Sequence, residues 1–251
     1  MVLSFRRYIG FFVAWAVGLV TLAAMPSQAV PQSFAATGVG QIPDSMICGS
    51  AGIPLALSFN VTGMGAPLTD VRVTLNFAPA HTFVGDLTAT LRPPAGSPSV
   101  ILFSRVGSTT ANSAGSGASM DGSYTFVDPS VSTANIWAAA SGGVLVPSGT
   151  YAVTLPGPVA TTPAGTAPMT SVFAGLSAAQ INGTWTLNIT DRCTSDVGGI
   201  SQATLQLEST PPAQEFTVNP LQLNFDVVDV NELTLRAFRV TAAASNTQNI
   251  D

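Results

Sequence analysis

Apolar and polar residues alternate with a period of two along several short stretches of this chain. Successive side chains of a β-strand point to opposite faces of a sheet, so this alternation predicts strands with one buried and one solvated face. The clearest stretches lie at residues 71–77, 87–91, 184–190 and 205–207, and others at 55–61, 100–103, 123–127 and 150–155. With about eight or nine strands, the chain is expected to be all-β, and a sandwich of two sheets is the economical architecture.

The composition supports this class of fold and excludes others. Of the 251 residues only 8% are charged, against about a quarter in an ordinary soluble domain, which is too few for a disordered tail or a solvated coiled coil. The 23 glycines and 18 prolines are typical of a chain with many turns. All eight basic residues are arginine and the net charge is -5, so no nucleic-acid partner is expected.

The N-terminus has the pattern of a secretory signal peptide. Arg6 and Arg7 precede an uncharged run at residues 11–24, and small residues follow up to Ala29. The alternative, an uncleaved anchor, is disfavoured because a membrane-spanning helix needs about 20 apolar residues. We therefore expect residues 1–29 to be removed, leaving a secreted, periplasmic or cell-surface protein that does not span the membrane.

The two cysteines, Cys48 and Cys193, would enter an oxidising compartment together. An even and minimal cysteine count in a secreted chain predicts a Cys48–Cys193 disulfide. The alternative is a pair of free, buried thiols.

A Pro-Pro pair at residues 211–212 marks a domain boundary. We expect one β domain over residues 30–209 and, over 210–251, a Pro-rich linker with a partial β segment of three short strands at 216–218, 221–225 and 233–240. The stretch 219–225 resembles the first strands of bacterial immunoglobulin-like modules. Two long loops are expected within the first domain, at 107–122 and 156–168, either as mobile connectors or as sites of ligand contact.

Residues 81–87, His-Thr-Phe-Val-Gly-Asp-Leu, follow the alternating stretch that begins at Asp70 and together with it resemble the central motif of the proprotein convertase P domain, also called the P/Homo B domain. Further matching segments lie around it in the same order as in that family; they include residues 43–44 before the motif and, after it, 91–96, 102–107, 124–128, 147–151, 173–176 and 182–187, with Asp191 and Gly198. The resemblance covers residues 41–208. It implies a galactose-binding-like jelly roll that usually follows and stabilises a subtilisin-like serine protease domain; bacterial relatives also occur on secreted proteins without a protease.

A catalytic role is not expected. A Ser-His-Asp triad needs a histidine as general base, and the single histidine, His81, already lies within the motif. Residues 165–169 are similar to the nucleophile turn of subtilisins, but Ala167 occupies the position of the nucleophile.

The motif residues are therefore expected to be structural: His81, Thr82, Gly85, Asp86 and, on a later strand, Trp185. Gly85 would allow an unusual φ in a sharp turn, and the Asp86 carboxylate would accept backbone N–H groups of that turn. For His81 the alternatives are a hydrogen-bonded structural imidazole and a metal ligand, of which the first is favoured because transition-metal sites use clusters of histidines.

Structural Ca²⁺ is the one cofactor kept open. Hard cations bind carboxylates and carbonyls in loops, although no spacing here forms a recognised calcium loop. The candidate ligands are Asp44, Asp121, Asp128, Asp191 and Asp196.

Three functions follow from these expectations. The first is a secreted, non-catalytic module that mediates interactions with a protein or surface partner or stabilises a neighbouring extracellular domain. The second is an accessory to, or fragment of, a secreted subtilisin-like serine protease. The third is a carbohydrate- or cell-surface-binding module, for which the fold class is the only argument.

Overall fold

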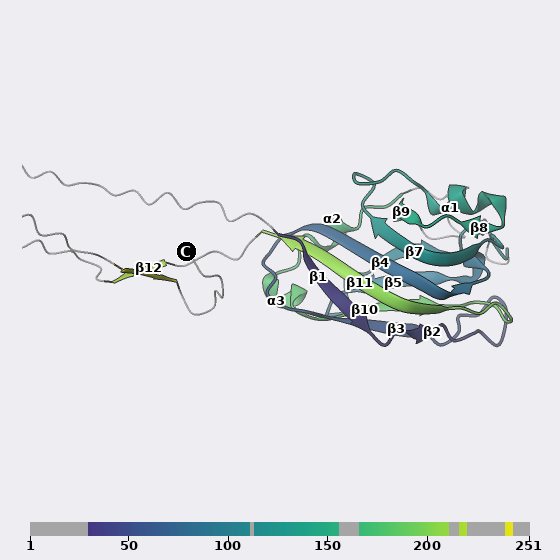
Figure 1. The fold of residues 1–251 in the computed structure, drawn as a ribbon, viewed down its shortest axis with the longest axis horizontal. Coiled ribbons are helices and arrows are strands. Elements are labelled where there is room, and N and C mark those ends of the chain that lie inside the picture. Colours follow the sequence, from purple (N-terminus) through teal and green to yellow (C-terminus); the bar gives the residue numbers. More distant parts are fainter. Residues whose placement is uncertain (1–29, 111–112, 156–165, 211–215, 220–238, 243–251) are drawn as a thin grey trace, which may run out of the picture.

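The computed structural model describes residues 30–110, 113–155 and 166–210, and the backbone of two short strands at 216–219 and 239–242. The predicted signal peptide, most of the predicted loop at 156–168 and the predicted strand at 221–225 lie outside these residues. Most of the secondary structure is β-strand, so the expected all-β class is confirmed (Figure 1).

Eleven strands form one curled, mixed sheet in the order β6-β5-β10-β3-β1-β11-β4-β7-β8, with β2 also paired to β11 and β9 to β7. The pairs β7–β8 and β7–β9 are parallel, and the other pairs of this sheet are antiparallel. The strands are β1 (Gln32–Thr37), β2 (Gly40–Gln41), β3 (Leu55–Val61), β4 (Leu68–His81), β5 (Thr88–Arg92), β6 (Val100–Ser104), β7 (Ser119–Val127), β8 (Leu145–Val146), β9 (Gly149–Ala152), β10 (Gly183–Thr190) and β11 (Gly199–Ser209).

Strand β1 connects two halves of the sheet. Its residues 32–35 pair with β11, and Ala36 and Thr37 pair with β3. Figure 1 shows β1 running from the half with β11, β4 and β7 to the half with β3 and β10. Apolar side chains from both halves therefore meet in one core.

The alternating stretches form the core as predicted. In β4, Val71, Val73, Leu75 and Phe77 are fully buried. In β10, the fully buried Trp185 donates a hydrogen bond from Nε1 to the Ile181 carbonyl at 2.7 Å, and its ring packs edge-to-face on Phe173. The Trp185 side chain thus has both an apolar packing partner and a hydrogen-bond acceptor inside the fold.

Short helices occupy connections in which no helix is predicted from the sequence. They are α1 (Ile136–Ala139), α2 (Thr170–Phe173) and α3 (Ala178–Ile181), with 3-10 turns η1 (Val84–Asp86) and η2 (Ala140–Gly142). A single helical turn has no hydrophobic periodicity to detect, but its caps are visible in retrospect: the Asn135 side chain accepts a hydrogen bond from the Trp137 N–H, and Ser177 and Gln180 form a capping box.

The expected loop at 107–122 is shorter in the structure, because β7 begins at Ser119. Its residues 113–118 run beside η1, where Gly85 N donates to the Ser116 carbonyl and Val84 N to the Ala118 carbonyl. This part of the loop is held by backbone hydrogen bonds.

Beyond β11, strands β12 (Phe216–Asn219) and β13 (Arg239–Ala242) pair antiparallel in a separate two-stranded sheet. The immunoglobulin-like character of this segment stays a prediction. Among the described residues, every helix is too short to cross a membrane.

Candidate functional site

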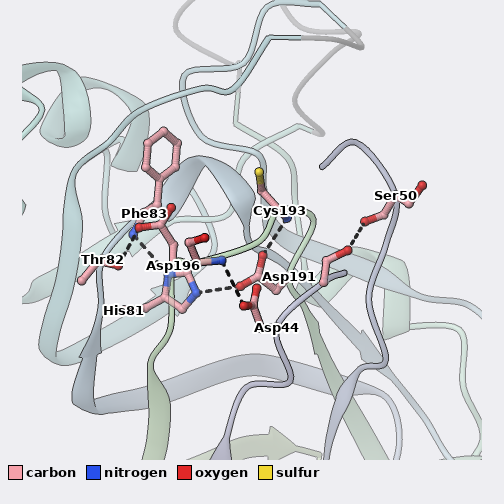
Figure 2. A network of polar contacts seen from close by, with 10 residues as sticks. Asp44, Ser50, His81, Thr82, Phe83, Asp191, Cys193 and Asp196 are labelled. Carbon is pink, nitrogen blue, oxygen red and sulfur yellow. Dashed lines mark hydrogen bonds and ion pairs between the residues drawn. The ribbon is translucent and has the colours of Figure 1, made fainter. Parts of the chain in front are cut away.

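The centre of the predicted motif is a buried pair formed by His81 and Asp191. His81 is the last residue of β4, and Asp191 directly follows β10. The distance from His81 Nε2 to Asp191 Oδ2 is 3.0 Å, and neither side chain is exposed (Figure 2). The pair thus connects the ends of two strands that do not neighbour each other in the sheet.

The neighbouring backbone determines which imidazole nitrogen carries the proton. The Phe83 N–H donates to His81 Nδ1 at 3.3 Å, so Nδ1 is the acceptor and Nε2–H donates to Asp191. The other carboxylate oxygen of Asp191 accepts from the Cys193 N–H at 3.0 Å (Figure 2). Both ring nitrogens are therefore hydrogen-bonded within the protein.

Gly198 closes the space above His81. A Cβ atom at residue 198 would lie 2.4 Å from His81 Cα and 2.6 Å from its Cβ. A side chain at residue 198 would have to displace the backbone of His81, so this close approach requires glycine.

Gly85 has a similar role, which corrects the expectation of an unusual φ. It is not among the glycines with positive φ, but a Cβ atom there would lie 2.4 Å from the Ala114 carbonyl oxygen and 2.7 Å from Ser116 N. Glycine lets the described part of the 107–118 loop approach η1 closely.

Asp86 also differs from its predicted role. No backbone amide of the described chain donates to its carboxylate; the side chain is 5% exposed beside other charged groups. Burial, followed by the Asp191 and Asp196 carboxylates, raises the pKa of Asp86 to about 6, although His81 and Arg105 act in the opposite direction. Asp86 is thus a desolvated acid in the structure.

Arg105 was not singled out by the sequence. It is 7% exposed, has a positive φ of 47°, and donates from its guanidinium to the Ser113 carbonyl. Burial lowers the pKa of Arg105, and the nearby Arg192 lowers it further. The sequence signal that could have indicated a buried arginine is its position directly after the apolar strand β6.

The predicted Cys48–Cys193 disulfide is present. It joins the loop between β2 and β3 to the loop between β10 and β11. Reciprocal hydrogen bonds support it: Gly49 N donates to the Arg192 carbonyl at 2.8 Å, and Arg192 Nη2 donates to the Gly49 carbonyl at 2.9 Å.

Three of the five candidate calcium ligands lie in this region (Figure 2). Asp191 binds His81, Asp44 accepts from Ser195 N at 3.0 Å, and Asp196 accepts from Thr82 Oγ1 at 2.8 Å. These carboxylates are thus engaged with protein donors.

The other two candidates lie elsewhere: Asp121 is within β7, and Asp128, directly after β7, accepts from the amides of Met169 and Thr170 at the start of α2. Within residues that the structure describes, no group of three or more histidine, cysteine or acidic side chains is arranged to hold a metal ion. Calcium binding stays a prediction.

Ala167, at the position expected for a subtilisin nucleophile, donates its N–H to the Val153 carbonyl at 2.9 Å and packs against the core.

Comparisons with protein-family models, with curated proteins and with solved structures find no match for this chain.

Proposed function

We propose that this chain is a secreted, non-catalytic module of the P-domain type, which mediates interactions with other molecules or stabilises a neighbouring extracellular domain. The fold that we propose for residues 30–209 is a galactose-binding-like jelly-roll sandwich. The passage of β1 from one half of the sheet to the other, with a shared core between the halves, supports this fold.

The observation that carries the proposal is the environment of the single histidine. A general base must reach a substrate proton, directly or through one water molecule. His81 is fully buried, and its two ring nitrogens are used by Phe83 N and by Asp191. With both ring nitrogens hydrogen-bonded inside the protein, this histidine has a structural role.

The secreted-protease alternative is supported only by the sequence resemblance. It concerns the neighbouring domain that this module would accompany, and not the chemistry of the module itself. The carbohydrate alternative has less support. Sugar rings stack on exposed aromatic side chains, and every aromatic residue whose side chain the structure describes is buried or half-buried.

The non-catalytic proposal is tested with the mature chain, residues 30–251. A quenched fluorescent peptide library and a fluorophosphonate probe for activated serines should show neither hydrolysis nor labelling. The matched control is His81→Ala, which removes the one imidazole. Inhibitor-sensitive hydrolysis by the wild type that disappears in a folded His81→Ala variant would overturn the proposal.

A further inference from the structure

The loop between β2 and β3 exposes large aliphatic side chains. Met46 is 91% exposed, Ile47 67% and Ile53 76%; Val197, in the loop joined to it by the disulfide, is 45% exposed. We call these four residues the disulfide-loop patch. Single exposed aliphatic residues are normal on a protein surface, whereas contiguous groups of them mark interaction sites. These four lie on two loops that the disulfide joins.

The loop that carries the patch is held in place. Besides the disulfide and the Gly49–Arg192 hydrogen bonds, Gly52 N donates to the Asp191 carbonyl at 2.8 Å. The buried Ser45 hydroxyl lies 3.0 Å from the carbonyl oxygens of Ile47 and Ser50. A partner therefore meets an already ordered loop, which reduces the entropic cost of binding.

The patch lies at the end of the sheet opposite the first and last strands' outer ends. Strand β11 begins at Gly199 beside Gln41 of β2, near the patch, and runs to the opposite end of the sheet, where Leu207 pairs with Gln32 of β1 (Figure 1). The described domain is thus entered and left at the end away from the patch.

The charge beside the patch indicates what it binds. Asp44 precedes Met46 by two residues and is exposed, and Asp196 directly precedes Val197. Arg192 is the one cation of these two loops, and its guanidinium is already hydrogen-bonded to the Gly49 carbonyl. The whole chain has thirteen carboxylates against eight arginines. An apolar surface with an acidic border is complementary to an apolar surface that carries cations.

We infer that the disulfide-loop patch binds a basic, apolar peptide segment of a partner protein. The aliphatic side chains of the peptide cover Met46, Ile47 and Ile53. The lysine or arginine side chains of the peptide pair with Asp44 and Asp196. A second copy of this chain fits less well, because it would bring the same carboxylates together. A lipid surface also fits less well, because insertion would remove these carboxylates from water.

This inference rests on the proposed interaction function and specifies its site. The probe is a phage-displayed library of random linear peptides selected on the biotinylated mature chain. Enriched peptides should combine aliphatic residues with lysine or arginine. Their affinity, measured by fluorescence polarisation, should fall about tenfold or more in a Met46→Ser/Ile53→Ser variant and severalfold in Asp44→Asn, and should weaken with added salt.

The matched control is Val144→Ser, since Val144 is 78% exposed but directly precedes β8 and belongs to neither of these loops. It should keep wild-type affinity, and circular dichroism should show all variants folded. The inference is overturned if no peptide is enriched, if enriched peptides lack basic residues, or if they bind the Met46→Ser/Ile53→Ser variant as well as the wild type. It is also overturned if the Met46→Ser/Ile53→Ser variant loses self-association that the wild type shows in analytical ultracentrifugation. The same holds if this variant loses binding of the wild type to phosphatidylcholine vesicles in a flotation assay.

The proposed function and the proposed binding site can be disproved independently of each other. Peptides that bind elsewhere on the module would remove the patch and leave an interaction module, whereas His81-dependent hydrolysis would remove the non-catalytic proposal whatever the patch binds.

Discussion

The Nε2 atom of His81 lies 3.0 Å from Oδ2 of Asp191, inside the protein and 110 residues away along the chain. Because β4 and β10 belong to different halves of the sheet, this hydrogen bond connects the halves at the end where the disulfide also lies. His81, part of the motif that resembles the P domain, thus links the ends of two strands in the folded protein.

Removing the imidazole should destabilise the fold. We expect His81→Ala to lower the free energy of unfolding by about 3 kcal/mol, because it leaves a buried carboxylate without its donor and creates a cavity. Urea denaturation measures the change. The control is Thr82→Ala, at an exposed residue whose hydroxyl bonds Asp196 and whose loss should cost less than about 1 kcal/mol. Equal effects of the two substitutions would contradict the role given to His81.

The close approach at Gly85 predicts a steric penalty. Gly85→Ala should lower the free energy of unfolding by about 2 kcal/mol or more, because the new methyl group meets backbone atoms of Ala114 and Ser116. Gly142→Ala is the matched control, since a Cβ there has no neighbour within 4 Å, and should change stability by less than about 0.5 kcal/mol. A neutral Gly85→Ala would show that the loop does not pack there.

The raised pKa of Asp86 predicts a pH dependence of stability. The folded protein holds this proton up to about pH 6, whereas the ordinary value is 3.8, so the stability that protonated Asp86 confers is present below pH 3.8 and is lost as the pH rises to about 6. Asp86→Asn mimics the protonated acid. It should therefore stabilise the protein at pH 7 by about 1 to 3 kcal/mol and leave it unchanged near pH 3.5.

Chemical denaturation at the two pH values measures this difference. Asp121→Asn, at an exposed residue of β7, is the control and should have little effect at either pH. A destabilising Asp86→Asn at pH 7 would mean that the carboxylate accepts hydrogen bonds, as the sequence had suggested.

The disulfide should contribute strongly to stability. It closes a loop of 145 residues, for which chain entropy predicts about 5 kcal/mol, a figure that measured bridges often do not reach. A Cys48→Ser/Cys193→Ser variant should therefore melt well below the oxidised wild type. Mass spectrometry of an unreduced digest should show the cross-linked peptide; free thiols in the secreted protein would contradict the pairing.

The domain boundary can be tested by truncation. The eleven-stranded sheet ends with Ser209, but Thr210 still donates its N–H to the Pro67 carbonyl at 3.1 Å. A chain of residues 30–210 should fold and melt within a few degrees of residues 30–251. A much lower melting temperature would show that the C-terminal segment belongs to the same core.

The sequence alone determined the strands with clear alternation, since alternation is a local property: Val71 to Phe77 and Trp185 to Ile189 bury the side chains that the pattern assigned to the core. It did not predict β1, β2 or β8. The disulfide was also predictable, because two cysteines leave a single intramolecular pairing. The roles of Gly85, Asp86 and Arg105 were not predictable. Steric room, desolvation and hydrogen-bond partners are set by segments distant in sequence, and only the packing of the loops around His81 and Asp191 brings those segments together.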